Sequence, residues 1–184
     1  IMLANQAEGF MVMGDVSRAI AGYRAALELL TTSFESYVLA PTTLWSLGVA
    51  LDRSGDLDGA LASIERARSY DPHDTRLKDD GWFFVPPYDA SYYAALGEWL
   101  RARKGGDTEQ RLGAYERCVL AWKQYLGQAP EAGTYVPVAR ARLKLAEKEY
   151  ADYGERVRTP TPIEKPAGVS KPHVARPAPR NPGP

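Results

Sequence analysis

Few residues of this sequence have the types and spacing that catalysis or metal binding requires. A cluster of carboxylates would attract a cation, but its spacing is not that of a calcium-binding loop; it consists of Asp71, Asp74, Asp79 and Asp80. A solvated turn is the simpler interpretation. His73 has no second histidine or cysteine nearby, and Gly105-Gly106 lacks the Lys and Ser/Thr of a phosphate-binding loop. We therefore expect no catalytic residue, no metal site and no cofactor, and a protein that is not an enzyme.

The amino-acid composition excludes further classes of protein. The chain of 184 residues has a single cysteine, Cys118, which excludes an internal disulfide framework. Because Cys118 occupies an apolar position of a helical pattern, we expect a buried and inert thiol. No apolar run approaches the ~20 residues that a membrane-spanning helix needs, so we expect no transmembrane segment.

The net charge of zero conceals an asymmetry along the chain. Residues 156–184 carry six basic residues and one acidic residue, a net charge of +5. Residues 1–155 carry 17 basic and 22 acidic residues, a net charge of −5. An acidic body argues against a nucleic-acid partner, whose binding domain would show a basic surface. The basic segment predicts a contact with something acidic.

The basic segment is also rich in proline. Eight prolines lie between residues 159 and 184, with almost no large apolar residue among them. Such a segment buries too little surface to offset its ordering entropy, and it favours polyproline II or disorder. We expect residues 156–184 to form an extended tail. Arg176 and Arg180 are its candidate contacts with an acidic partner surface.

Residues 1–155 show helical periodicity and predict an all-α domain. The clearest unit spans residues 41–74, where two helices are separated by Gly55-Asp56, and Asp56 is placed to cap the second helix. Small and apolar residues recur at the spacing of two closely packed helices. They are Leu44, Leu47, Gly48, Leu51, Ala60, Ile64 and Ala67.

This unit resembles the tetratricopeptide repeat, a helix–turn–helix of ~34 residues. Two more units align with it, at about 1–34 and 90–130, and Gly14-Asp15 mirrors the Gly55-Asp56 turn. Extra residues at 31–40 are expected to extend the second helix of the first unit. A final helix over 137–153 has one apolar stripe and suits a capping role. The resemblance implies a helical solenoid of about three repeats with a concave groove that binds protein segments.

The resemblance also assigns residues to the groove. The candidate partner-binding residues on the helices are Trp45, Asp52, Arg53, Glu98 and Arg101. Glu8 occupies an equivalent position, and with Asp52 and Glu98 it would give the groove an acidic lining; solvated helix surface is the alternative. Trp45 would anchor a peptide, or it packs against a neighbouring helix or the following insertion.

That insertion spans residues 73–90 and is dense in aromatic residues. Its candidate partner-binding residues are Trp82, Phe83, Phe84 and Tyr88. Pro86-Pro87 favours an extended backbone there. Two interpretations stay open: the aromatic side chains fill the space between the second and third units, or part of them forms an exposed patch that docks a partner.

These features favour a non-enzymatic protein-interaction scaffold that uses groove, insertion and tail. The alternative is a structural accessory subunit of a larger bacterial assembly, tethered by its Pro-rich tail. A third possibility places the tail in the chain's own groove. The sequence starts at Ile1, which is compatible with a removed signal segment and favours the bacterial periplasm or envelope over the cytoplasm.

Overall fold

The computed structural model describes residues 2–30, 33–79 and 84–159, and this part of the chain is all-α, as predicted. Seven α-helices and one 3₁₀-helix make up its secondary structure, with no strand among the described residues. Their order is α1 (Met2–Val12), α2 (Val16–Glu28), α3 (Ser33–Arg53), α4 (Leu57–Tyr70), η1 (Thr75–Lys78), α5 (Asp89–Lys104), α6 (Thr108–Gln128) and α7 (Val136–Arg158).

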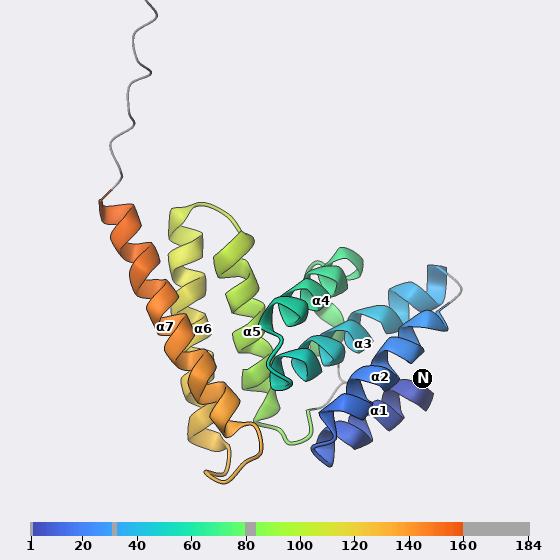
Figure 1. Ribbon diagram of the computed structural model, residues 1–184. Coiled ribbons are helices and arrows are strands. Elements are labelled where there is room, and N and C mark those ends of the chain that lie inside the picture. The colour runs from blue at the N-terminus through green and yellow to red at the C-terminus, as the bar shows by residue number, and fades with distance from the viewer. Residues whose placement is uncertain (1, 31–32, 80–83, 160–184) are drawn as a thin grey trace, which may run out of the picture.

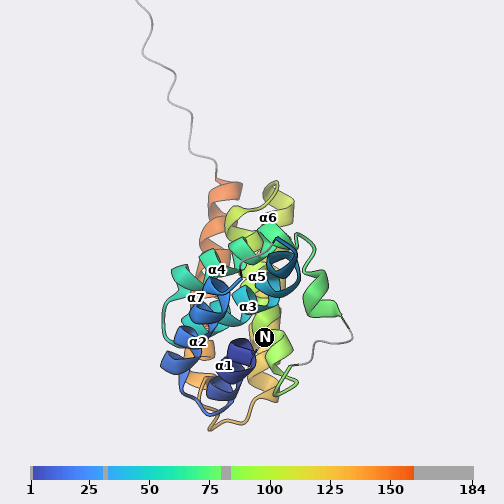
Figure 2. The ribbon, with the colours of Figure 1, turned by 90° about the vertical axis from the view of Figure 1, so that its right-hand side faces the viewer.

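Consecutive helices pack as hairpins. Helix α1 lies on α2, α3 on α4, and α5 on α6, while α7 lies along α6. Figure 1 shows α5, α6 and α7 side by side at one end, α3 and α4 in the middle, and α1 and α2 at the other end. The short helix η1 stands at the edge of the body, coloured green in Figure 2.

The same turn closes all three hairpins. A glycine with positive φ stands before an aspartate that caps the next helix, at Gly14-Asp15, Gly55-Asp56 and Gly106-Asp107. Asp56 Oδ1 accepts a hydrogen bond from the Gly59 backbone N–H at 2.8 Å, which confirms the predicted cap. Asp15 and Asp107 accept equivalent bonds three residues on. Local sequence therefore specifies where each hairpin turns.

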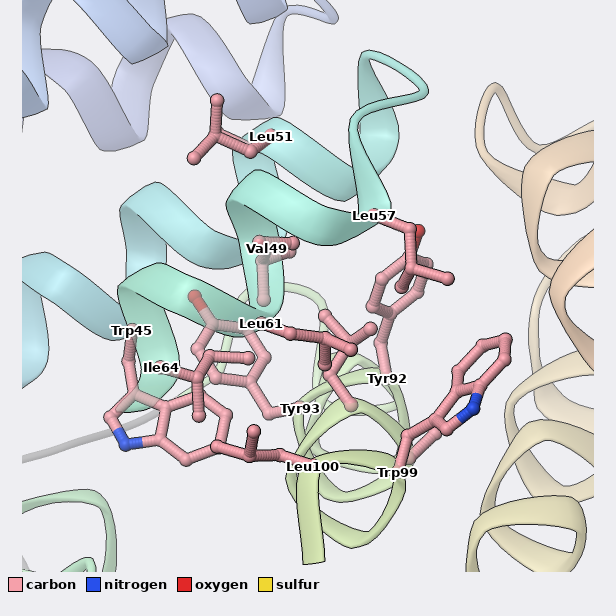
Figure 3. Close-up of a cluster of buried hydrophobic side chains, with 14 of the residues drawn as sticks. Trp45, Val49, Leu51, Leu57, Leu61, Ile64, Tyr92, Tyr93, Trp99 and Leu100 are labelled. Carbon is pink, nitrogen blue, oxygen red and sulfur yellow. The ribbon is translucent and has the colours of Figure 1, made fainter. Parts of the chain in front are cut away.

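Close helix contacts need small residues. A Cβ atom at Gly48 would lie 2.9 Å from Ile64 Cγ1 and 3.0 Å from the Ala60 carbonyl oxygen, so the predicted close approach of α3 and α4 is confirmed. The core continues from this pair into α5, where Figure 3 shows Tyr92, Tyr93, Trp99 and Leu100 meeting the side chains of α3 and α4.

Two helix boundaries differ from those expected. Residues 33–40 do not extend the second helix; they begin α3, which runs through Pro41 to Arg53. Pro41 is buried inside this helix, and the hydroxyls of Thr42 and Thr43 both donate to the Leu39 carbonyl.

The last helix is longer than the expected 137–153. It continues to Arg158, and so includes the first residues of the segment predicted as tail. Tyr153 anchors this extension, since its ring lies 5.6 Å from that of Tyr115 and 4.4 Å from the Arg111 guanidinium. Residues 160–184, with Arg176 and Arg180, lie outside the described residues.

Candidate functional site

A cavity with a volume of about 670 Å³ is lined by residues from distant parts of the chain. It is bounded by α1, the end of α3, the segment 84–88, the start of α5, the end of α6 and the loop before α7. The lining residues are Asn5, Glu8, Gly9, Met11, Val12, Arg53, Phe84, Val85, Pro86, Tyr88, Asp89, Tyr93, Tyr125, Gly133, Thr134 and Tyr135.

Hydrogen bonds at and near this cavity join distant parts of the chain. The Tyr135 hydroxyl, just before α7, donates to the Met11 carbonyl of α1 at 3.0 Å. Further along α7, Arg142 donates to Asp52 Oδ1 at 2.6 Å and to the Gly55 carbonyl at 3.1 Å. The residue before α7 thus contacts the first hairpin, and α7 itself contacts the second.

A buried ion pair forms part of the cavity wall. Arg53 Nη2 lies 2.8 Å from Asp89 Oδ2, and both side chains are less than a tenth exposed. The Arg53 guanidinium also stacks 4.0 Å from the ring centre of Tyr135 and 4.8 Å from that of Tyr92. Burial opposes its charge, but the neighbouring Asp89 carboxylate outweighs this and raises the pKa of Arg53. Arg53 is thus a fixed cation.

This wall retains unused hydrogen-bonding capacity. Within the described chain, Arg53 Nε and Asp89 Oδ1 are buried without a hydrogen-bond partner. Glu8 accepts a hydrogen bond of 2.6 Å from the Ser46 hydroxyl and forms no ion pair with a described residue. Buried polar atoms are normally satisfied, which distinguishes Arg53 Nε and Asp89 Oδ1 from most of the buried polar atoms in proteins.

Aromatic rings give the cavity its shape. Tyr93 stacks on Trp45 with ring centres 6.0 Å apart, and Phe84 packs edge-on against Tyr93 at 5.0 Å. Tyr88 packs in the same manner on Tyr125 at 5.6 Å. Burial raises the pKa of Tyr125 to about 12, against the opposing charge of Arg53. The Tyr125 phenol therefore stays neutral, and the rings together present apolar surface.

The rim of the cavity is apolar and exposed. Val12 and Val85 line it and are 64% and 56% exposed, and Met13 beside Val12 is 71% exposed. These three are among the most exposed large hydrophobic residues of the described chain. Exposed apolar side chains around a concave site are typical of a surface that docks a partner.

The predicted site residues divide into those at the cavity and those elsewhere. Arg53, Phe84 and Tyr88 line it. Glu98 and Arg101 do not: Arg101 pairs with Asp74 at 3.1 Å, and Glu98 pairs with Arg117 at 2.9 Å. Trp82 and Phe83 lie outside the described residues. The predicted partner-binding residues therefore do not form a single site: three line the cavity, and Glu98 and Arg101 lie away from it.

Two candidate groove residues are buried, which corrects their assignment as partner contacts. Trp45 is only 3% exposed and its indole N–H donates to Asp74 Oδ1 at 3.2 Å, as in the packing interpretation. Asp52 is fully buried between the Tyr92 hydroxyl and the Arg142 guanidinium. The physical reason is the same for both: later elements of the chain cover the inner face of α3.

Sequence reasoning missed Tyr125 and Tyr135. Tyr125 lies near the end of α6, and Tyr135 lies in the loop before α7, where no periodic pattern indicates a groove position. Tyr135 reaches the cavity through a contact with a residue 124 positions earlier in the sequence. The sequence itself carried no signal for that juxtaposition.

The carboxylates between residues 71 and 79 serve local structure. Asp71 accepts hydrogen bonds from the Thr75 hydroxyl and the Arg76 backbone N–H; burial alone would raise its pKa, but these bonds lower it. Asp74 binds Arg68. No cluster of three potential metal ligands occurs among the described residues. Cys118 is buried and does not line the cavity.

Comparison with known proteins identifies no relative: no family model, curated protein or solved structure matches this chain. Over the described residues, no helix combines the length and the apolar character that crossing a bilayer demands.

Proposed function

We propose that the three hairpins and α7 form a tetratricopeptide-like solenoid. The Gly–Asp turn recurs at Gly14, Gly55 and Gly106, always with positive φ and a capping aspartate. Each hairpin also packs on the next: α2 against α3, and α4 against α5. A recurring turn and nearest-neighbour packing are what a repeat array requires.

We further propose that the protein is a non-enzymatic interaction module that seats an extended protein segment in its inner cavity. The observation that carries this proposal is the combination of an aromatic cavity with an exposed apolar rim at Val12, Met13 and Val85. A rim of this kind favours a ligand that enters the cavity with one side chain and continues across the surface with its neighbours.

The chemistry of the wall supports a binding role. The tyrosines are rigid, with faces and hydroxyl groups that contribute to recognition at low cost in conformational entropy. Arg53 is neutralised by Asp89 and held between two rings, so it contributes shape and N–H groups more than net charge. The cavity therefore suits an aromatic, proline or long aliphatic side chain.

A selection experiment tests the function. The immobilised full chain is used to select binders from a library of natural protein segments, and affinities are measured by isothermal titration calorimetry. Val12→Glu and Val85→Glu change exposed side chains at the rim, so we expect the fold to persist and the affinity to fall at least tenfold.

Leu120→Glu is the matched control. Leu120 is 54% exposed on α6 and does not line the cavity, so its replacement leaves the affinity unchanged. If the selected segments bind both rim variants with unchanged affinity, the binding surface lies elsewhere and the proposal is rejected.

A further inference from the structure

We propose that the cavity binds the chain's own basic, proline-rich segment, residues 160–184, so that the protein masks its own binding site. This inference rests on the proposed function and names one occupant of the same site. It follows from the unpaired carboxylate oxygens of the cavity, the composition of the segment, and the distance between the end of α7 and the cavity.

One carboxylate of the cavity, Glu8, pairs with no described cation. Glu8 accepts a hydrogen bond from the Ser46 hydroxyl, and Asp89 Oδ1 is buried without a hydrogen-bond partner although Oδ2 pairs with Arg53. Tyr88 and Tyr93 also line the cavity. An arginine or lysine side chain that enters here gains a charge-assisted bond to Glu8 and contact with aromatic rings.

The segment supplies that chemistry repeatedly. Residues 160–184 contain four basic side chains and one acidic one, a net charge of +3. A basic residue directly precedes proline at Lys165, Lys171 and Arg176, and Arg180 precedes Pro182 by two positions. Proline-rich segments favour polyproline II, which docks into aromatic-lined grooves at low entropic cost.

The length of α7 sets which part of the segment reaches the cavity. Tyr135, just before α7, lines the cavity, whereas Arg158 ends the same helix. The 23 residues of α7 span about 35 Å at ~1.5 Å per residue. A chain that returns along it in polyproline II needs about 11 residues at ~3.1 Å each. Lys165 is therefore too near the helix end to reach the cavity, whereas Arg176 and Arg180 reach it.

Tethering makes weak contacts effective. A short flexible connection gives an effective concentration in the millimolar range, so even a modest intrinsic affinity occupies the site. The attraction has a charged component, and added salt weakens it. A partner that binds the cavity must then displace the segment, and its apparent affinity is reduced by the fraction of closed molecules.

Photo-cross-linking in the full chain locates the occupant. A benzophenone amino acid replaces Val85, which is exposed at the rim, and the cross-linked peptides are identified by mass spectrometry. We expect links to residues 171–184, within one molecule at low protein concentration. A probe at Leu120 serves as the control and should give no such links. Absence of any link from position 85 to residues 160–184 would overturn the proposal.

Competition measures the masking. A synthetic peptide of residues 160–184 is titrated into three full-length proteins: wild type, Arg176→Glu/Arg180→Glu and Lys165→Glu. We expect the double variant to bind the peptide at least tenfold more tightly than wild type, because its own segment competes less. Lys165→Glu should match wild type. Val85→Glu added to the double variant should abolish the gain.

The outcomes separate this inference from the function beneath it. If selected foreign segments bind at the rim while the 160–184 peptide binds none of the proteins, self-masking is wrong and the interaction module stands. Equal peptide affinity in wild type and the double variant also rejects self-masking. If neither foreign segments nor the peptide respond to Val85→Glu, both proposals fail.

Discussion

Asp74 joins the segment after α4 to the helical body, and its replacement gives the sharpest test of the packing described above. Its carboxylate accepts hydrogen bonds from the Trp45 indole at 3.2 Å, from Arg68 Nη2 at 2.9 Å and from Arg101 Nη2 at 3.1 Å. Asp74 is buried and has a left-handed backbone, with φ at 53°. Asn tolerates that backbone conformation, so Asp74→Asn removes the charge without adding backbone strain.

The structure sets the size of the expected loss. The Arg101 side chain is 44% exposed, so its ion pair contributes little. The Arg68 side chain is only 15% exposed. Breaking a buried pair by removing one partner costs about 3–5 kcal/mol. Arg68 keeps its bond to the Gly97 carbonyl at 3.1 Å, and asparagine still offers one oxygen acceptor, so we expect a smaller loss of about 2–3 kcal/mol.

Urea denaturation followed by tryptophan fluorescence measures the loss. With an m-value of about 2 kcal/mol/M, the midpoint should fall by about 1–1.5 M. A double-mutant cycle with Arg68→Met gives a second measurement. In the Arg68→Met background, Asp74→Asn should lower the free energy of unfolding by at least ~1.5 kcal/mol less than in wild type, because no buried cation is left unpaired. An undiminished cost in the Arg68→Met background would refute the reasoning that an unpaired Arg68 causes the loss.

Three further predictions concern backbone, pH and thiol chemistry. Gly55→Ala should destabilise by about 1–2 kcal/mol because φ there is 102°; thermal denaturation checks this. Glu149 lies half-buried, where burial alone would raise its pKa, but bonds from Arg103 and Trp99 lower it below the usual 4.5. Its stabilising effect is therefore present above pH ~4.5 and lost as pH falls through the lowered pKa. Cys118 is fully buried and burial raises its pKa, so a thiol reagent should modify it only at the rate of unfolding.

Each of these has a matched control. Gly154→Ala, inside α7 with open space around it, should stabilise by about 0.5–1 kcal/mol, opposite in sign to Gly55→Ala. Glu149→Gln should differ from wild type at pH 7 and converge with it at low pH; a constant difference would contradict the linkage. Cys118 labelling that is fast in the absence of denaturant would show that α6 opens locally.

Much of the fold was predictable because its signals are local. Gly14-Asp15 and Gly55-Asp56 place turns from two residues each, since a positive φ and a side-chain cap depend only on neighbours. The predicted contact at Gly48 followed from helical periodicity. The predicted start of this helix was wrong: proline is typical of the first turn of a helix, whereas α3 begins at Ser33 and Pro41 lies buried inside it.

The candidate site was predictable only in part. Arg53, Phe84 and Tyr88 were named from the sequence and line the cavity, but Trp45 and Asp52 are buried beneath other elements. Aromatic density indicated a region of interest without showing which rings face outward. Exposure depends on what covers a residue, and the covering groups are Asp74 over Trp45 and Arg142 over Asp52.

The sequence by itself determined the all-α class, the hairpin turns and the division of charge between residues 1–155 and 156–184, because helical period, capping and composition are properties of neighbouring residues. Tertiary structure alone decided that α7 returns to the first hairpin, where the Tyr135 hydroxyl meets the Met11 carbonyl. That contact joins residues 124 positions apart, and both of them line the cavity. No single sequence motif encodes it, because it depends on how distant helices pack.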